Sequence, residues 1–403
     1  MTVAGIRHNI FLYLYIMLPH LNNLSPEERS LLLLCLPKYD RQDYALLEKS
    51  ISEIKNWPGF AGMVNEHGII ALAYHQFKAS GLLTKIPPVI MEKFRTGYFA
   101  SLRRNTLIYK LFYETADIAR NNGIKIIPVK GLLLEKTVYG DAGLRQMNDL
   151  DLLTSPEDAF KLRNLLLKEG YQSIPFISPI HSFFMHSYGK HMPEMIKDGL
   201  NVEIHFRLFG DKGNKITLDM VRLSKEAFPG ENEILFSPPA LYNFLYLVKH
   251  LVSHEKKDNS QLRLYCDLLF LLEKSGNEII NHNLYELARQ AGILNELNRT
   301  LYLLRYFFGA VSGAPETDIT TNAVLNFIRF LRQPKNDPAP DERGGFFGQI
   351  ENIEGIHHKI LYACGMLFPS LTFMKWRYNT KNRLQALLYY PRRWFDFARK
   401  LFK

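Results

Sequence analysis

The residues of this sequence with the clearest capacity for chemistry are two aspartates, Asp149 and Asp151, separated only by Leu150. In an extended strand, successive side chains point to opposite faces, so both carboxylates lie on one face and Leu150 lies on the other. Two carboxylates side by side repel each other, and the repulsion raises their pKa values unless a cation lies between them. The pair therefore indicates a site for a hard divalent cation, Mg²⁺ or Mn²⁺.

A third carboxylate would complete such a site, and Glu203 is the main candidate because it lies in a segment of alternating polar and apolar residues. This segment forms part of a predicted hairpin. Its strands, His191–Lys197 and Leu200–Leu208, flank Asp198-Gly199, a pair that is typical of a type I′ turn. The register of this hairpin places Glu194 opposite Glu203 on the same face. Glu194 is therefore the alternative third carboxylate.

The elements around the two aspartates alternate between strand and helix. Ile124–Val129 is apolar and β-branched, which predicts a strand, and Leu132–Tyr139 has helical spacing. Leu150–Thr154 predicts a second strand, and Ser155-Pro156 predicts the start of a helix that ends near Glu169. We expect an α+β fold, in which a small mixed sheet lies between helical regions.

Amphipathic helices are predicted on both sides of this core. We expect an N-terminal helical region over residues 1–121, a core over 122–236 and a C-terminal helical region over 237–403. Ile174–Met185 contains two prolines and allows no assignment, and Gln333–Gly348 reads as a linker rich in Pro, Gly and charge. The predicted flanking helices are Ile10–Leu18, one that begins at Ser25-Pro26, Arg41–Lys55, Pro58–Val64, His67–Ser80, Pro88–Asn121, Leu241–Ser253, Gln261–Lys274, Leu284–Ala291 and Glu296–Phe308.

Composition limits the class of protein. The chain has 403 residues, of which 47% are hydrophobic, enough for a sizeable core. Its three cysteines lie far apart in apolar runs, which predicts reduced thiols and a cytoplasmic location. The sequence contains no run of 18 or more apolar residues, so no transmembrane helix is predicted. Walker A and GxGxxG patterns are absent from the sequence, which disfavours P-loop and Rossmann chemistry.

Much of the net charge of +10 is concentrated at the C-terminal end. Residues 375–403 contain nine Lys or Arg and a single acid, Asp396, and they also contain aromatic residues such as Trp376 and Trp394. Such a tail could hold an anionic membrane surface, nucleic acid or an anionic substrate, and a membrane-peripheral location is one alternative. No DNA partner is specifically indicated. The simpler interpretation is a helical cap with a solvated basic face.

The ordered set of motifs resembles the uncharacterised nucleotidyltransferases of the DNA polymerase β-like superfamily. The resemblance extends from about Trp57 to Leu272, and more loosely to Leu367-Phe368-Pro369 and Arg377-Tyr378. It rests on the following residues: Ile127-Pro128-Val129-Lys130-Gly131, Arg145, Asn148-Asp149-Leu150-Asp151-Leu152-Leu153, Gly170-Tyr171 and Val202-Glu203-Ile204-His205.

This resemblance implies an enzyme that transfers an NMP from an NTP, most simply ATP, to an acceptor of unknown identity. It implies that Asp149 and Asp151 hold divalent metal ions that bridge the triphosphate. Glu203 would then complete the site of the acceptor-side metal and help to remove the acceptor's proton. An inactive binding module with the same fold, and a phosphoryl transferase that uses the same metal site, are the alternatives.

Lys130-Gly131 departs from the Gly-Gly or Gly-Ser pair of most of the superfamily, but it is similar to the pair of the uncharacterised group. Gly131 still allows the backbone to approach a phosphate at a helix N-terminus, and Lys130 adds a positive charge. Arg145 is a second candidate phosphate ligand.

The sequence allows more than one role for each of three histidines. His205 is a nucleotide-binding candidate, although a packed or hydrogen-bonded histidine is the simpler reading. His250 and His254 share one helix face, next to Lys249 and upstream of Asp267. This group is a candidate for a polar contact with the nucleotide or with the catalytic domain or, as the weaker alternative, for zinc binding.

Overall fold

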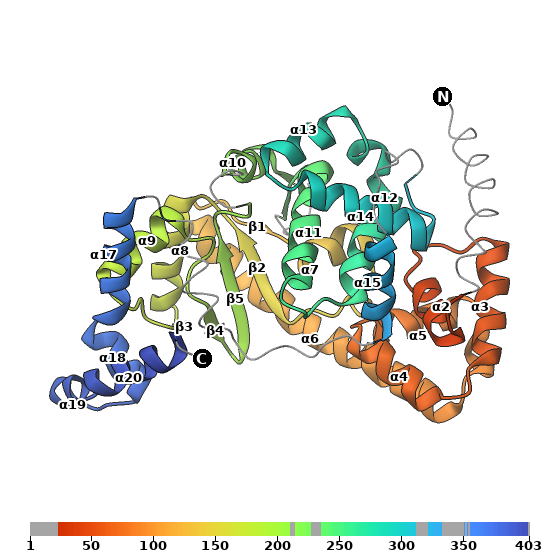
Figure 1. Ribbon diagram of the computed structural model, residues 1–403, viewed down its shortest axis with the longest axis horizontal. Helices are drawn as coiled ribbons and strands as arrows, with labels where there is room; N and C mark the ends of the chain where they lie inside the picture. Colours follow the sequence, from red (N-terminus) through yellow and green to blue (C-terminus); the bar gives the residue numbers. More distant parts are fainter. Residues whose placement is uncertain are drawn as a thin grey trace. The chain divides into compact units, whose positions relative to one another are not determined.

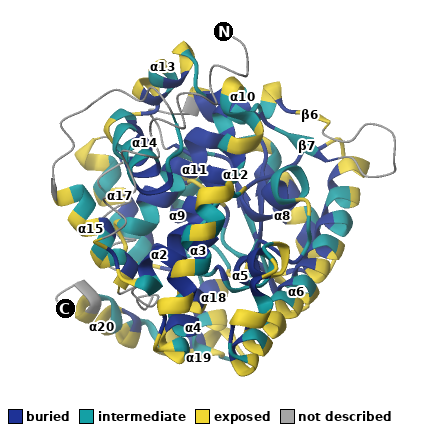
Figure 2. Ribbon diagram, turned by 90° about the vertical axis from the view of Figure 1, so that its right-hand side faces the viewer, coloured by how far each residue is buried: buried dark blue, intermediate teal, exposed yellow. Residues whose placement is uncertain are grey.

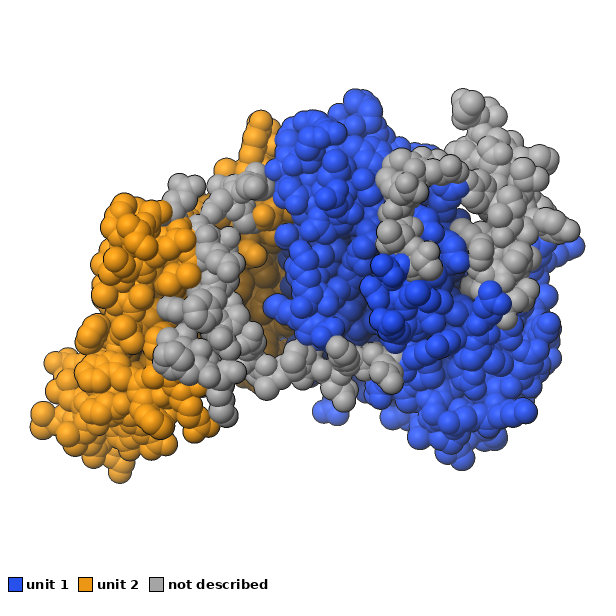
Figure 3. All heavy atoms as spheres, viewed as in Figure 1, with its two compact units in different colours: residues 1–110, 129–148, 223–338 blue, residues 111–128, 149–222, 339–403 orange. Residues whose placement is uncertain are grey.

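The computed structural model describes residues 23–209, 214–226, 235–311, 321–332, 350, 353 and 355–401. It is mostly helical with a small five-stranded mixed sheet, so the predicted α+β class is confirmed. Contacts between residues divide the chain into two units (Figure 3). Unit 1 comprises 1–110, 129–148 and 223–338, and unit 2 comprises 111–128, 149–222 and 339–403. The three predicted regions stay a prediction. The predicted Ile10–Leu18 helix and Gln333–Gly348 linker lie outside the described residues.

The N-terminal helices follow the sequence signals closely. The Ser25 hydroxyl accepts a hydrogen bond from the Glu28 backbone, and the Glu28 carboxylate accepts one from the Ser25 backbone, which together cap the first helix. Its four leucines, 31–34, are buried. These elements are α2 (Pro26–Leu34), α3 (Arg41–Glu53), α4 (Trp57–Glu66), α5 (Ile70–Ala79), the short 3₁₀ helix η1 (Leu82–Lys85) and α6 (Pro88–Asn121), which belongs to both units.

The sheet lies in unit 2 and has the strand order β1-β2-β5-β4-β3 (Figure 1). The central strands β2 and β5 are parallel, and the other pairs are antiparallel. The predicted strand Ile124–Val129 is present but is limited to Ile127–Pro128. The sequence analysis predicted no strand at the position of β3. The strands are β1 (Ile127–Pro128), β2 (Asp149–Leu153), β3 (Gln172–Ser173), β4 (Met195–Lys197) and β5 (Leu200–His205).

The β4–β5 hairpin has the predicted turn and register near that turn. Asp198 and Gly199 both have positive φ, 52° and 74°, as a type I′ turn requires. Met195 pairs with Val202, but further along the hairpin His191 pairs with His205. The two pairs are four residues apart on the β4 side of the hairpin but only three residues apart on the β5 side. The extra residue on the β4 side forms a β-bulge. Pro193 lies within this interval, where its missing N–H does not interrupt a regular ladder.

The helix α8 packs against one face of this sheet. Ser155 caps α8 (Pro156–Lys168), and Phe160 of α8 approaches Phe206 with ring centroids 6.3 Å apart. Phe206 continues the alternation that places Val202 and Ile204 on one face of β5. The odd-numbered residues of β2 and β5, which include the acids, therefore lie on the face turned away from α8.

One helix of unit 2 was missed although its signal is present. Ser178 caps α9 (Pro179–Tyr188), which repeats the Ser-Pro start seen at the two helices predicted correctly. Its Phe184 packs against Tyr362 with ring centroids 5.5 Å apart. The remaining described helices of unit 2 are α10 (Asn214–Leu223), α17 (Ile356–Leu367), α18 (Leu371–Tyr378), α19 (Arg383–Leu388) and α20 (Tyr390–Leu401).

The rest of unit 1 is built on two helices, α11 and α12, whose apolar faces are largely buried (Figure 2). Phe244 of α11 and Tyr265 of α12 are among its most deeply buried side chains. None of the described helices is long and apolar enough to cross a membrane. The elements here are α7 (Gly131–Leu134), the π-helical turn η2 (Glu135–Tyr139), β6 (Lys225–Glu226), β7 (Phe236–Ser237), α11 (Ala240–Glu255), α12 (Leu262–Ile279), α13 (His282–Gln290), α14 (Leu294–Phe308) and α15 (Thr321–Arg332).

Candidate functional site

The parallel pairing of β2 and β5 places Asp151 beside Glu203. The two residues are direct partners in the register, so their side chains project from the same face of the sheet. Like charges on directly opposed strand residues destabilise a sheet unless something compensates. The side chain of Asp151 is 3% exposed and that of Glu203 is 28% exposed. One carboxylate is therefore enclosed while the other reaches solvent.

The imidazole of His205 lies between these two carboxylates. His205 follows Glu203 by two residues and therefore shares its face of β5. Its Nε2 donates to Asp151 Oδ1 at 2.7 Å and lies 3.2 Å from Glu203 Oε2. The three residues form the one cluster of three candidate metal ligands that the described residues contain, with ligand atoms within 4.8 Å of one another.

The structure thus brings together two of the three predicted carboxylates and adds the histidine. Asp149 lies two residues before Asp151 on the same face, is half-buried, and pairs in register with Asn201. Its ligand atoms do not belong to the three-residue cluster. The role of Asp149 stays a prediction. The third member of the cluster was readable from the sequence as the i+2 neighbour of Glu203 on the same strand.

Glu194, the alternative third carboxylate, lies near Glu203 but outside the cluster. Burial raises the pKa of Glu194, the negative charge of Glu203 raises it further, and a hydrogen bond with the side chain of Asn201 lowers it. The electrostatic influence of Glu203 agrees with the predicted register of the hairpin. Within the described residues, Glu194 does not join Asp151 as a ligand.

Lys130 and Gly131 form the turn into α7 in unit 1. Lys130 has φ 53° and ψ −120°, a conformation that suits glycine and strains other residues, and it is buried. At Gly131, an added Cβ would lie 2.7 Å from Arg145 Nη1 and 2.7 Å from Met147 Cγ. Gly131 is therefore required by packing, whereas Lys130 keeps a strained backbone conformation that glycine would adopt more easily.

Arg145 forms a buried ion pair with Asp267 of α12. Its Nε donates to Asp267 Oδ1 at 2.9 Å and its Nη2 donates to Oδ2 at 2.7 Å, and Tyr139 donates to the same carboxylate at 3.0 Å. Both charged side chains are at most 6% exposed. Such a bidentate pair fixes the loop before β2 to α12. The predicted contact between Arg145 and a phosphate stays a prediction.

Two residues of α6 that sequence reasoning missed hold the same loop. The Asn105 amide donates to the carbonyls of Ala142 and Arg145 at 2.6 and 2.8 Å. Arg104 donates to the carbonyls of Met147 and Asn148. Asn105 is fully buried, and the available signal was a polar residue on the buried face of an otherwise amphipathic helix.

The rings of His250 and His254 lie 4.4 Å apart on α11 in unit 1. Burial lowers the pKa of His254, and the positive charges of Lys130 and Arg263 lower it further, whereas hydrogen bonds with Asn259 raise it. Among the described residues, no third ligand joins the two histidines, so the pair lacks the set that a zinc site needs. The nucleotide contacts predicted for Lys249 and His250 stay predictions.

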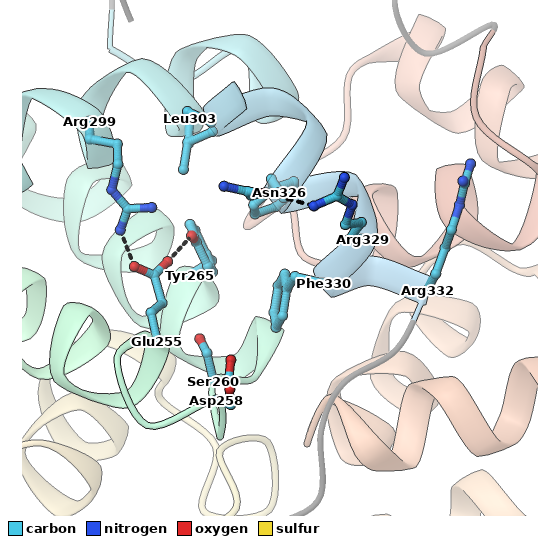
Figure 4. A pocket seen from close by; sticks show the side chains of 12 residues that line it. Glu255, Asp258, Ser260, Tyr265, Arg299, Leu303, Asn326, Arg329, Phe330 and Arg332 are labelled. Atoms are coloured by element: carbon cyan, nitrogen blue, oxygen red, sulfur yellow. Dashed lines mark hydrogen bonds and ion pairs between the residues drawn. The ribbon is translucent and has the colours of Figure 1, made fainter. Parts of the chain in front are cut away.

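A cavity of about 580 Å³ lies elsewhere in unit 1, between α12, α14 and α15 (Figure 4). Glu255 accepts hydrogen bonds there from Tyr265 and Arg299, and Phe330 forms another wall. None of the predicted site residues lines this cavity.

Comparison with known families agrees with the resemblance that the ordered motifs indicated. Residues 53–309 match the family described as uncharacterised nucleotidyltransferase, which is more than half of the chain. The chain belongs to this family. A comparison with curated proteins gave no significant match. The stretch matched to the uncharacterised nucleotidyltransferases contains the whole sheet and Asp267, and it ends before α15.

The strain at Lys130 predicts that glycine at this position stabilises the protein more than alanine does, which is the reverse of the usual order. Lys130→Gly and Lys130→Ala both remove the ammonium group, so a comparison of the two isolates the backbone. We expect the glycine variant to have the larger free energy of unfolding, by about 1 kcal/mol, because relief of the strained φ outweighs the entropy that glycine costs. Urea unfolding of both variants measures the difference. An alanine variant that is equally or more stable would contradict the strained conformation.

The Arg145–Asp267 pair predicts strong coupling in a double-mutant cycle. Arg145→Met and Asp267→Leu each leave a buried charge without its partner, so each should lower the free energy of unfolding by about 3 kcal/mol. The double variant should cost clearly less than the sum of the two. The exposed pair Arg95–Glu92 is the matched control, and its removal should change stability little. Additive losses at Arg145 and Asp267 would show that the two side chains do not act as a pair.

Proposed function

We propose that this protein is a metal-dependent nucleotidyltransferase that moves an NMP from an NTP, ATP in the simplest case, to an acceptor, with pyrophosphate as the leaving group. The acceptor is a small molecule, a glycan precursor, a peptide or a protein. The observation that carries the proposal is the convergence of Asp151, Glu203 and His205 on one face of the parallel strand pair. Family membership supports the same reaction class. The free cysteines support a cytoplasmic location.

The donor set fits a divalent cation. Carboxylate oxygens are the ligands that Mg²⁺ and Mn²⁺ prefer, and an imidazole nitrogen is tolerated better by transition metals such as Mn²⁺. We propose that Asp151 and Glu203 hold the metal and that Asp149, on the same face, extends the set toward the nucleotide. When bound, the metal supplies charge neutralisation for the phosphate oxygens at which the reaction occurs.

The three clustered side chains have different tasks in this proposal. His205 holds a proton at Nε2 and, through its 2.7 Å bond to Oδ1, fixes the rotamer of Asp151. Glu203 is the most exposed of the three, so it is the group that an incoming acceptor can reach. We assign to Glu203 the removal of the acceptor's proton in addition to metal binding.

We further propose nucleotide-binding roles for four residues that the sequence analysis singled out. Lys130 supplies a positive charge, and Gly131 supplies a backbone N–H at the start of α7, both suited to phosphate. Lys249 and His250 on α11 contact the nucleotide. Arg145 acts as a positioning residue, because Asp267 engages its guanidinium on two nitrogens.

Label position tests the reaction class directly. The full chain is incubated with Mg²⁺, a cell extract that supplies acceptors, and NTP labelled at either the α- or the γ-phosphate. We expect transfer of the α-label, reduced about a hundredfold or more in Asp151→Asn and Glu203→Gln, because each loses a metal ligand. Glu169→Gln, an exposed glutamate at the end of α8, is the matched control and should transfer normally.

The other outcomes separate the alternatives. Transfer of the γ-label in place of the α-label would mean a phosphoryl transferase. Nucleotide binding without any transfer would mean a binding module that keeps the fold. Equal α-label transfer by the wild type and both site variants would contradict the proposed metal site.

A further inference from the structure

The C-terminal helices α18, α19 and α20 form a packed element within unit 2. Tyr378 stacks on Tyr389 with centroids 4.7 Å apart, and Tyr378 donates to the Asp396 carboxylate at 3.2 Å. The Trp394 indole donates to the Leu367 carbonyl at 2.8 Å. Arg393 is only 4% exposed. These contacts fix which side chains of the element face outward.

The outward face of α19 is aliphatic. Ala386 is fully buried and marks the inward side of this helix. At about 100° per residue, Leu384 and Leu388 project from the opposite side. They are 75% and 80% exposed, and Leu387 beside them is 49% exposed. A helix on a water-exposed surface normally buries its large apolar residues. Here the alanine is buried and the leucines are exposed, which is the reverse of that pattern.

The outward face of α20 combines an aromatic residue with arginines. Phe395 lies opposite the buried Arg393 and is 65% exposed. By the same helical geometry, Arg392 and Arg399 lie on the flank of Phe395, and both are exposed. The aromatic side chain therefore has cationic groups on the outer surface of the same helix.

The charge of this element identifies the partner. Residues 375–403 contain nine basic residues and one acid, so two copies apposed through this surface would repel each other. Nucleic acid would satisfy the arginines, but it offers no environment for exposed leucines, which cannot stack on bases as aromatic rings do. An anionic bilayer satisfies both, because its headgroups pair with Arg and Lys while its acyl boundary accepts Leu and Phe.

We propose that α18–α20 form an interfacial element that binds the surface of an anionic phospholipid bilayer. Leu384, Leu388 and Phe395 enter the acyl boundary, and Arg383, Arg392 and Arg399 pair with the headgroups. Trp376, which is 48% exposed, lies at the level where tryptophan accumulates in membrane proteins. This binding is independent of the proposed nucleotidyl transfer, and it would hold the catalytic sheet near acceptors that are attached to or made at a membrane.

Vesicle flotation of the full chain tests the proposal. We expect the wild type to float with vesicles of phosphatidylcholine and phosphatidylglycerol in equal parts, far less with phosphatidylcholine alone, and less at high salt. Leu384→Ser/Leu388→Ser/Phe395→Ser should weaken partitioning roughly tenfold, and Arg383→Gln/Arg392→Gln should also weaken it. All five side chains are exposed, so neither variant disturbs the core.

Two matched controls distinguish binding through this surface from nonspecific hydrophobic adsorption and from effects of the proposed catalytic site. Val89→Ser/Phe99→Ser/Leu107→Ser removes three exposed apolar side chains of α6 and should leave flotation unchanged. Asp151→Asn should float like the wild type whether or not nucleotidyl transfer is observed. The proposal is overturned if the wild type does not float with anionic vesicles, or if the serine triple variant floats normally. Binding of a single-stranded RNA in place of vesicles would also overturn it, since the surface would then belong to nucleic acid.

Discussion

The constraint on which the candidate site depends is the parallel pairing of β2 with β5, which sets Asp151 directly beside Glu203. Neighbouring carboxylates on one face are unfavourable by themselves, and the imidazole of His205, in contact with both, offsets part of this cost. A divalent cation would compensate the same charges more strongly. The apolar faces of the two strands are buried, and of the two paired acids Asp151 is enclosed while Glu203 reaches solvent.

Unit 1 contains a strained residue and several buried polar contacts in the chain that precedes β2. Lys130 is held in a glycine-like conformation at the start of α7, and such a cost persists only where the surroundings enforce it. Asn105, Arg104 and the Arg145–Asp267 pair fix the loop that leads to β2. The chain thus concentrates several buried polar contacts in the residues just before the aspartates.

The sequence predicted those parts of the structure that local rules determine. Ser-Pro caps, the Asp198-Gly199 turn and the alternation around Asp151 each determine their own segment, and the helix Pro88–Asn121 has the predicted bounds. The shortness of β1, the bulge near Pro193 and the place of His205 between the acids depend on pairing between distant strands, which no local pattern contains. Arg145 illustrates the same limit, because its partner Asp267 is 122 residues away. The helix α9 is a different case, because a local signal for it was available: Ser178-Pro179 has the same pattern as the Ser-Pro pairs that predicted two other helices.

The most direct measurement of the central claim is a crystal of the full chain soaked with Mn²⁺ and a nonhydrolysable NTP, with data collected for the anomalous signal of manganese. The account predicts a manganese peak about 2.1 Å from carboxylate oxygens of Asp151 and Glu203, with the triphosphate bound to the same ion. A nucleotide bound elsewhere, or manganese bound at a site without Asp151 and Glu203, would contradict it.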